Sequence, residues 1–257
     1  MAVKPVLRPI LPSRGFLLIL TIESAGSTRL RTAGYPCVSI TQMTTSENYI
    51  LPEPTLRRMP WYLAYIEILR ATGAKTVSTT RISRALNVDS SQIAKDLSFL
   101  NIKGKTRIGY DIADLSAALR DFLGFSRAHN AIIVGIGSLG GALLHDKGLA
   151  KYGLNIVAGF DVDPRVAGTT ISGVPVYGVE EMEKVRRATG AEIGILTVPA
   201  DKAQLTADIM VSTGIKAIWN FTPYRVRVAE GIVMANTSIY AHLALIYNRL
   251  NADMSGC

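Results

Sequence analysis

The segment from Gly135 to Gly140 constrains the fold of this chain more than any other part of its sequence. It has the spacing Gly-x-Gly-x-x-Gly, follows the unbroken apolar run 130–134, and leads into a helical pattern that starts at Gly141. An apolar run of this length is typical of a strand buried on both faces of a parallel sheet. In such a strand-to-helix turn, the first glycine makes the tight turn, the second lets the backbone approach a diphosphate, and the third lets the helix pack on the strand. The pattern predicts a Rossmann domain, a doubly wound α/β sheet.

A dinucleotide is the ligand that such a loop holds, with its diphosphate at the N-terminus of the helix. The next predicted strand, 156–160, ends in Asp161, which lies 21 residues after Gly140. A carboxylate there accepts hydrogen bonds from the adenosine ribose and repels a 2′-phosphate, so we expect NADH and NAD rather than NADP(H). The alternative is that Asp161 only caps the turn before Pro164. The candidate residues of this region are Gly135, Ile136, Gly137, Ser138, Leu139, Gly140, Asp161 and Val162.

Two further predicted strands, 192–199 and 217–223, end in polar residues, and a helix is predicted between them over 200–212. Ligands of doubly wound sheets lie beyond the carboxyl ends of the strands, so these residues are placed to line the pocket. Taken singly, each is also explained as a polar turn residue after a buried strand. The candidates are Thr197, Val198, Pro199, Asn220, Phe221 and Thr222, within a predicted dinucleotide-binding domain over 128–236.

Residues 50–127 predict a different kind of domain. Its helical patterns span 54–72, 81–86 and 91–100, with Ser78 and then Asp89 or Ser90 as the predicted N-caps of the last two. A short helix, a tight turn and a capped helix form the plan of a helix-turn-helix, and a plain three-helix bundle is the alternative. Four residues near the start of the third helix are expected to face outward, and their side chains can form hydrogen bonds with base edges and phosphates: Ser90, Ser91, Gln92 and Lys95.

The segment that follows favours the DNA-binding interpretation. Residues 103–110 form a basic, glycine-punctuated pattern that predicts a hairpin, the wing of a winged helix. Lys103, Lys105 and Arg107 supply cations suited to phosphates beside the groove. A further helix over 112–123 is expected to join the two domains. We therefore predict a winged-helix domain that binds double-stranded DNA.

The charge distribution agrees with a polyanionic partner. The formal net charge is +8, of which residues 1–48 carry +3 and residues 49–127 carry +5, while residues 128–257 are neutral. A basic half attached to a neutral half suggests a polyanion-binding segment, although a basic surface by itself is weak evidence. The two cysteines, Cys37 and Cys257, and the three histidines have no metal-ligand spacing, so we expect no metal site and a reducing compartment.

The first 48 residues are a poor candidate for a folded unit. They contain four prolines and one short apolar run, 16–20, which is far below the roughly 20 residues of a membrane span. We interpret this extension as disordered or not native, with Met43 as an alternative start. No membrane partner is expected, and the predicted location is cytoplasmic.

The chain ends in an apolar helix over 237–250, with Ile239, Leu243, Ile246 and Leu250 on one face. No later segment is there to cover it, which suggests packing against a partner subunit in a homodimer. Packing within its own domain is the alternative.

Together these residues resemble the Rex family of redox-sensing transcriptional repressors, from about Thr55 to Leu250. The most specific parts are Val88-Asp89-Ser90, the run 92–98, and 104–110; the glycine motif, 160–163, 196–199 and 220–223 continue the match in order. The resemblance implies a repressor that binds operator DNA when NADH is low and is released by NADH. It also implies a homodimer with an exchanged C-terminal helix, 237–251.

Two positions depart from the common pattern of that family. Ala94 stands where many members have Arg before the Lys-Asp of the recognition helix, so the base contacts are expected to differ. Ser238 stands where many have an acidic residue just before the last helix, which puts an interdomain ion pair from that position in doubt.

Two other functions compete with this one. The first is an NAD-dependent dehydrogenase with a basic accessory domain. Such an enzyme needs an acid or base at the nicotinamide, yet no Tyr is followed by Lys four residues later, and His242 is the only histidine that could be placed there. We therefore predict no catalytic residues and no enzyme. The second is a nucleotide-independent DNA-binding protein whose Rossmann domain serves only dimerisation.

Overall fold

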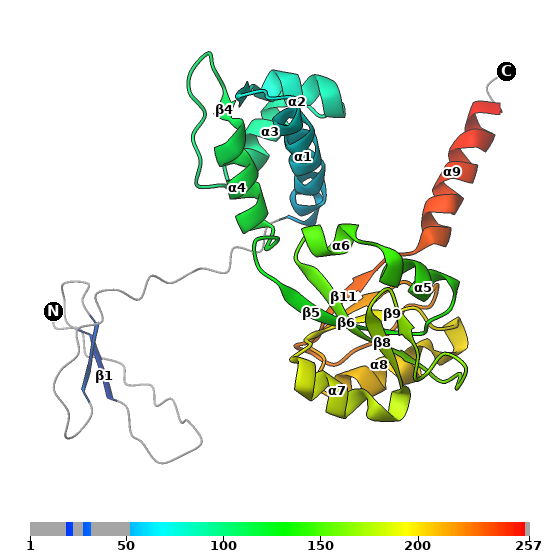
Figure 1. Cartoon of the computed structure of the whole chain (residues 1–257). Coiled ribbons are helices and arrows are strands. Elements are labelled where there is room, and N and C mark those ends of the chain that lie inside the picture. Colours follow the sequence, from blue (N-terminus) through cyan, green and yellow to red (C-terminus); the bar gives the residue numbers. More distant parts are fainter. Residues whose placement is uncertain (1–18, 23–27, 32–51, 255–257) are drawn as a thin grey trace. The chain divides into compact units, whose positions relative to one another are not determined.

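The computed structural model describes residues 19–22, 28–31 and 52–254, and the chain divides into two units, 1–52 and 53–257 (Figure 1). The first unit contains two strands that the sequence did not predict, β1 (Ile19–Ile22) and β2 (Thr28–Arg31), paired antiparallel. The remainder of the extension lies outside the described residues. Its expected lack of stable structure therefore stays a prediction.

The second unit begins with the elements of a winged helix. These are α1 (Glu53–Ala71), β3 (Thr76–Val77), α2 (Thr79–Leu86), α3 (Ser90–Leu97), β4 (Tyr110–Asp111) and α4 (Ile112–Phe122). Their apolar residues form one buried core, which includes Met59, Leu63 and Ile66 of α1 and Ile93 and Leu97 of α3. The three- and four-residue spacing of apolar positions thus predicted the buried residues of α1, except that Leu56 at its start is 39% exposed.

Local hydrogen bonds set the ends of the two middle helices. The Ser78 side chain accepts from the backbone N–H of Arg81, and Asn87, in the left-handed region at φ 52°, ends α2. Asp89, rather than Ser90, caps α3. This helix ends at Leu97 instead of the predicted Leu100, because the backbone N–H groups of Phe99 and Leu100 bond to carbonyls three residues back, as in a tightened last turn.

Short strands and a hairpin distinguish this domain from a plain three-helix bundle. β3 pairs antiparallel with β4, with Val77 opposite Tyr110. At Gly109, φ is +94° and a Cβ atom would stand 2.2 Å from the carbonyl oxygen of Val77, so only glycine fits. The helix expected to join the domains, α4, is part of this core: Ile112, Leu115 and Leu119 are buried in it.

The rest of the second unit is a seven-stranded sheet with helices on both faces. Its elements are β5 (His129–Val134), α5 (Ser138–His145), α6 (Gly148–Lys151), β6 (Leu154–Asp161), β7 (Thr170–Ile171), β8 (Val174–Gly178), α7 (Met182–Thr189), β9 (Ile193–Leu196), α8 (Ala203–Ser212), β10 (Ala217–Asn220) and β11 (Val233–Asn236). Two 3₁₀ turns, Val179–Glu181 and Ala200–Lys202, precede α7 and α8.

The strand order is β11-β10-β9-β5-β6-β8-β7, and every pair is parallel except β7 with β8. This is the predicted doubly wound Rossmann sheet. The order changes direction between β5 and β9, and ligands of such sheets lie at the carboxyl ends of the two strands that flank this point. Both strands end at predicted site residues.

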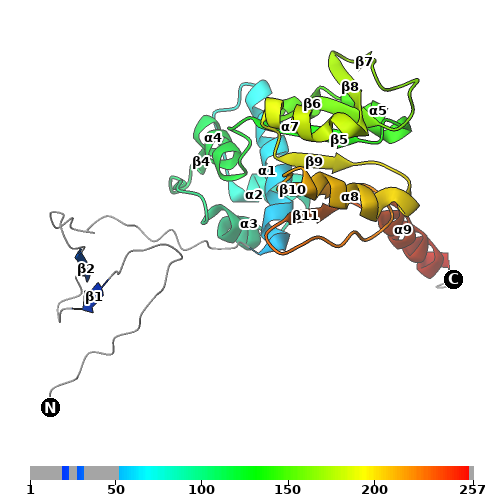
Figure 2. The same cartoon turned by 90° about the horizontal axis from the view of Figure 1, so that it is seen from below.

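Alternate side chains of β5 enter two different cores. Ile132 and Val134 pack with α7 and α8, whereas Ala131 and Ile133 pack on the side of α5. Figure 2 shows α8 lying along β9 on the first of these sides. Strand β8 and helix α7 were missed in the sequence: β8 contains a proline, and α7 buries only Met182 and Val185, too few for an apolar stripe.

The last helix is α9 (Ile239–Met254). All its described side chains are exposed in the single chain: Ile239 is 56% exposed, Ile246 54% and Leu250 56%. Packing within its own domain therefore does not cover this apolar face. In the described part of the chain, no helix is long and apolar enough to cross a membrane.

Candidate dinucleotide-binding and DNA-binding sites

The three motif glycines differ in what surrounds them. Gly135 has φ +95°, and a Cβ atom there would stand 2.9 Å from the carbonyl of Thr197. A Cβ atom on Gly140 would stand 2.0 Å from the carbonyl oxygen of Gly135. A Cβ atom on Gly137 would meet nothing within 4 Å. The first and third glycines are thus required by the packing of the loop, whereas the second leaves open space in which a diphosphate could approach the backbone.

The residue after β9 holds this glycine loop in place. The Thr197 hydroxyl lies 3.0 Å from the carbonyl oxygen of Val134 and 2.8 Å from that of Gly135. The Thr197 backbone N–H also donates to Val134. Thr197 therefore supports the loop, while the next two predicted residues, Val198 and Pro199, are half-buried and exposed.

Asp161, at the end of β6, is tied to the same loop. Its Oδ2 accepts from the backbone N–H of Ile136 at 2.6 Å, and its Oδ1 accepts from the N–H of Asp163 at 2.9 Å. Asp161 thus caps the turn before Pro164, as in the alternative interpretation, and it also bonds the glycine loop. Each carboxylate oxygen has about two lone-pair sites, so both oxygens keep one for a ribose hydroxyl.

The loop after β6 contains Val162, Asp163 and Arg165. The Val162 side chain is 80% exposed. Arg165 bonds Asp163 through Nε and Nη2, and this guanidinium lowers the pKa of Asp163 to about 2. An Arg near this position can accommodate a 2′-phosphate. Here its charge is already paired with Asp163.

The polar residues at the end of β10 are mainly structural. Asn220 is 1% exposed, and its amide donates to the carbonyl of Tyr224 and to Oδ1 of Asn236 while its oxygen accepts from the N–H of Thr222. Thr222 is also buried. Phe221 is half-buried, with its ring 4.5 Å from that of Trp219. Of these three predicted residues, Phe221 is the one with accessible surface that a ligand could contact.

The remaining predicted loop residues lie just before α5 and in its first turn. Ile136 is buried in the core on the α5 side of the sheet, Leu139 is half-buried and Ser138 is exposed. The described residues contain no group of three or more His, Cys, Asp or Glu side chains that could hold a metal ion.

The predicted DNA contacts fall on two elements of the winged helix. On α3, Ser91 and Lys95 are exposed, whereas Ser90 and Gln92 are half-buried. Ala94, the departure from the common pattern, is exposed between them. The exposed positions 91, 94, 95 and 98 follow the spacing of one helix face, so position 94 belongs to the surface that α3 offers.

The wing is a short turn closed by two backbone hydrogen bonds between Lys105 and Gly109, each 2.8 Å long. Lys103, Lys105 and Arg107 are all exposed. Arg107 has φ 64°, which is uncommon for a residue other than glycine. The hairpin therefore holds its cations on a defined turn.

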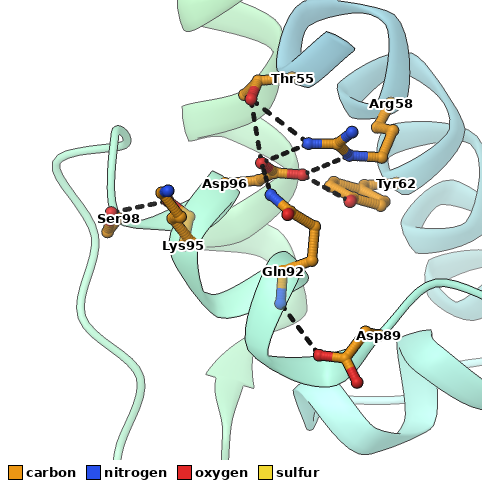
Figure 3. A network of polar contacts seen from close by, with 8 residues as sticks. All are labelled: Thr55, Arg58, Tyr62, Asp89, Gln92, Lys95, Asp96 and Ser98. Carbon is orange, nitrogen blue, oxygen red and sulfur yellow. Dashed lines mark hydrogen bonds and ion pairs between the residues drawn. The ribbon is translucent and has the colours of Figure 1, made fainter. Parts of the chain in front are cut away.

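The sequence analysis missed a buried ionic cluster behind α3, which we call the Asp96 cluster: Thr55, Arg58, Tyr62, Gln92 and Asp96 (Figure 3). The Asp96 side chain is 1% exposed. Arg58 donates to both its oxygens, at 2.7 and 2.9 Å. The Tyr62 hydroxyl donates at 2.7 Å and the Thr55 hydroxyl at 3.1 Å. One signal could have revealed it, because Asp96 occupies an otherwise apolar helix position beside Ile93 and Leu97.

The cluster perturbs the pKa values of its members. Burial alone would raise the pKa of Asp96, but the hydrogen bonds from Arg58, Tyr62, Gln92 and Thr55 outweigh it and lower this pKa below its usual value. Burial, followed by the hydrogen bond to the carboxylate, raises the pKa of Tyr62 to about 12. The bond to Asp96 raises the pKa of Arg58 as well. The ionic pair is thus the stable form at neutral pH.

Fold and sites together define a winged-helix protein with a Rossmann domain of the dinucleotide-binding type. The model of the family "Putative DNA-binding protein N-terminus" matches residues 50–98, and that of the "CoA binding domain" family matches residues 126–224. The redox-sensing transcriptional repressor Rex of Bacteroides fragilis is 55% identical over 201 residues, 78% of this chain and 91% of that protein. The Listeria monocytogenes repressor of the same name is 36% identical over 198 residues, 77% and 92% of the two chains.

Solved structures agree with these relatives. The crystal structure of RSP in complex with β-NAD+ and operator DNA matches with a TM-score of 0.76 at 36% identity, covering 80% of this chain and 94% of that one. RSP in complex with β-NADH matches with a TM-score of 0.72 at 36% identity, covering 80% and 96%. The chain belongs to the Rex family of redox-sensing transcriptional repressors. The dehydrogenase alternative is not supported, since the relatives that match over most of their length are repressors.

Proposed function

We propose that this protein represses transcription by binding operator DNA when NADH is scarce and leaves the operator when NADH occupies its Rossmann domain. One observation carries the proposal. The chain combines an exposed, basic winged helix with an open glycine loop at Gly137, and it is 36% identical to RSP, whose structures hold NAD+ with operator DNA in one case and NADH in another. Either half alone would fit many functions.

In this proposal the loop from Gly135 to Gly140 binds the diphosphate, and Asp161 binds the adenosine ribose beside Val162. Phe221, Val198 and Pro199 provide apolar surface, while Thr197, Asn220 and Thr222 hold their loops in shape. When bound, the dinucleotide acts as a ligand whose nicotinamide is cationic when oxidised and neutral when reduced. A dry pocket favours the neutral form, because burying an unpaired charge is costly.

NADH can shift the protein between two states only by its difference in affinity for them. We propose that the states differ in the separation of two winged helices, so that only one state matches successive half-sites of an operator. This requires two copies of the chain. A homodimer joined through α9, whose described side chains are all exposed, supplies them.

We further propose that α9 is exchanged between the subunits, that the domains span 50–127, 128–236 and 237–251, and that the protein acts in the cytoplasm. Ser238 departs from the common pattern of the family, and its hydroxyl accepts from the N–H of Ala241 at 3.1 Å, as a helix cap does. A serine at this position therefore starts α9 without contributing a charge.

The decisive experiment is a DNA-shift titration of the full chain on an operator, run in parallel with NADH, NAD and NADPH. We expect NADH to release the DNA at lower concentration than either other ligand. Equal operator affinity at every NADH concentration up to saturation, with NADH binding verified separately, would rule the switch out.

Two variants separate the two halves of the proposal. Asp161→Ala should lower NADH affinity by about ten- to a hundredfold, because it removes charge-assisted hydrogen bonds, and should leave operator affinity unchanged. Lys95→Ala should weaken operator binding and reduce its salt dependence by about one counterion, with NADH affinity unchanged. Loss of both activities in either variant would indicate misfolding instead of a separable role.

A further inference from the structure

The Gln92 side chain is held in one orientation. Its Nε2 donates to Oδ1 of Asp96 at 2.8 Å (Figure 3). An ionised carboxylate only accepts hydrogen bonds, so the group that faces Asp96 has to be the amide NH2 and not the amide oxygen. The bonds from Arg58 and Tyr62 keep Asp96 ionised and fixed in place. Among the residues that the structure describes, none donates to Oε1 of Gln92.

Ser91, the preceding residue, is oriented in the same way by a second carboxylate. Its hydroxyl lies 2.5 Å from Oδ1 of Asp89, the N-cap of α3, which also accepts from the backbone N–H of Ser91. Because Asp89 accepts only, the Ser91 hydroxyl has to donate its single hydrogen to it. Ser91 therefore also offers an oxygen with free lone pairs at the start of α3.

We propose that Asp89 and Asp96 orient Ser91 and Gln92 so that the start of α3 accepts hydrogen bonds from donor groups of the DNA. Gln92 Oε1 is the main acceptor and contacts one base in each half-site. The exocyclic amino groups of adenine and cytosine are the donors of the major groove, whereas guanine and thymine present acceptors there. Gln92 thus selects an amino base over a keto base. Asp96 is a positioning residue in this scheme, since it acts on the DNA only through Gln92. The inference rests on the proposed operator binding.

A free glutamine would lack this selectivity. Its amide can turn by half a rotation, so that it offers NH2 to guanine or thymine as readily as it offers oxygen to adenine or cytosine. The bond to Asp96 removes the first option. An acidic residue on the buried face of a DNA-reading helix thereby contributes to specificity and not only to packing.

The test compares operator affinities without NADH. Wild-type protein is titrated against operators in which each adenine or cytosine is replaced, one at a time, by the analogue that lacks only the exocyclic amino group. At one base per half-site we expect a three- to tenfold loss, the effect of one neutral hydrogen bond. The variant Gln92→Ala should bind the parent operator and that analogue operator with equal affinity. If alanine destabilises the fold, the near-isosteric Gln92→Met takes its place.

A second arm tests the role of Asp96. Nε of Arg58 and the Tyr62 hydroxyl both donate to Oδ2, so in Asp96→Asn this position keeps the oxygen and the new NH2 takes the place of Oδ1. There it faces Gln92 and Nη2 of Arg58, so the Gln92 amide has to turn its oxygen inward and the Arg58 Nη2 bond is lost. We expect the preference at this one base pair to change from the amino to the keto base. A structural role alone would weaken binding to all operators by the same factor. Thermal unfolding identifies a variant that is not folded, in which case the analogue arm decides.

Three results overturn the inference: no analogue weakens wild-type binding, Gln92→Ala weakens all operators uniformly as a phosphate contact would, or the base pair that depends on Gln92 prefers guanine or thymine at the contacted position. Failure of the wild-type protein to bind any operator is a different outcome. It would contradict the proposed function itself.

Discussion

The glycines at positions 137, 140 and 141 differ in the space around them and therefore in the reason why glycine is needed. A side chain at Gly140 collides with the loop, at 2.0 Å from the carbonyl oxygen of Gly135, whereas Gly137 and Gly141 have open space around them. The open space at Gly137 lies on the loop that is proposed to bind the diphosphate. Packing therefore explains Gly140, and ligand binding is the remaining reason for a glycine at 137.

Gly137→Ala should test that reason. We expect the melting temperature to stay within a few degrees of wild type, because Gly137 has an extended backbone and the new methyl group meets no protein atom. NADH affinity should fall at least tenfold, because the methyl group occupies the path of the diphosphate. Calorimetric titration measures the affinity, and Gly141→Ala, with equally open surroundings, is the matched control. Unchanged NADH binding in Gly137→Ala would contradict the assigned role.

At the scale of elements, the Asp96 cluster joins α1 to α3. Arg58 and Tyr62 from α1 hold the carboxylate on α3, so the helix that is proposed to read DNA has a fixed rotation against the core. Buried ion pairs of this kind add little net stability over an apolar pair, but breaking one is costly. The arrangement suits an element that has to present its side chains in one orientation.

The cluster should make the stability of the winged helix fall at both extremes of pH. Asp96 has a lowered pKa, so its contribution is present above its usual value of 3.8 and is lost as the pH falls through the lower, folded value. Tyr62 has its pKa raised from 10.0 to about 12, so its contribution is present below pH 10.0 and is lost as the pH rises towards 12.

Tyr62→Phe provides the measurement for the alkaline side. It should cost about 1.5 to 3 kcal/mol in the free energy of unfolding at pH 7, the net value of one hydrogen bond to a charged group. Absorbance titration should show one tyrosine with a pKa of about 12 in wild type that is missing in Tyr62→Phe. Tyr152→Phe, which alters a tyrosine that is 40% exposed and lies outside α9, is the control. A wild-type protein whose tyrosines all titrate near pH 10 would contradict the buried cluster.

At the scale of the whole molecule, α9 is the element whose role a single chain does not explain. Its face of Ile239, Leu243, Ile246 and Leu250 is apolar, yet each side chain is between 38% and 56% exposed. Exposed apolar surface of this extent marks an interaction site. In the proposed function, that site is the partner subunit.

A charge on this face should separate the subunits. Ile246→Glu places a carboxylate where the partner is proposed to pack, so sedimentation should show monomers in place of dimers and operator affinity should fall by more than tenfold. Asn248→Glu adds the same charge on the other side of α9 and should leave both unchanged. If Ile246→Glu stays dimeric, another surface joins the subunits.

The sequence by itself determined those features that depend on local spacing. The three- and four-residue spacing of apolar residues predicted the first helix, the unbroken apolar run predicted the strand before the glycine loop, and the Gly-x-Gly-x-x-Gly spacing predicted the Rossmann turn. Ser78 was recognised as a helix cap because capping acts within one helical turn. These interactions join residues close in the chain, so their pattern can be read directly.

Only the tertiary structure decided which polar residues support the sites and which face outward. Asp161 bonds Ile136 across 25 positions, and Arg58 bonds Asp96 across 38. Thr197 likewise bonds the carbonyls of Val134 and Gly135, and no local pattern marks such pairs. A side chain's hydrogen-bonding capacity is set by its type, but the partner that uses it is set by which distant segments the fold brings together.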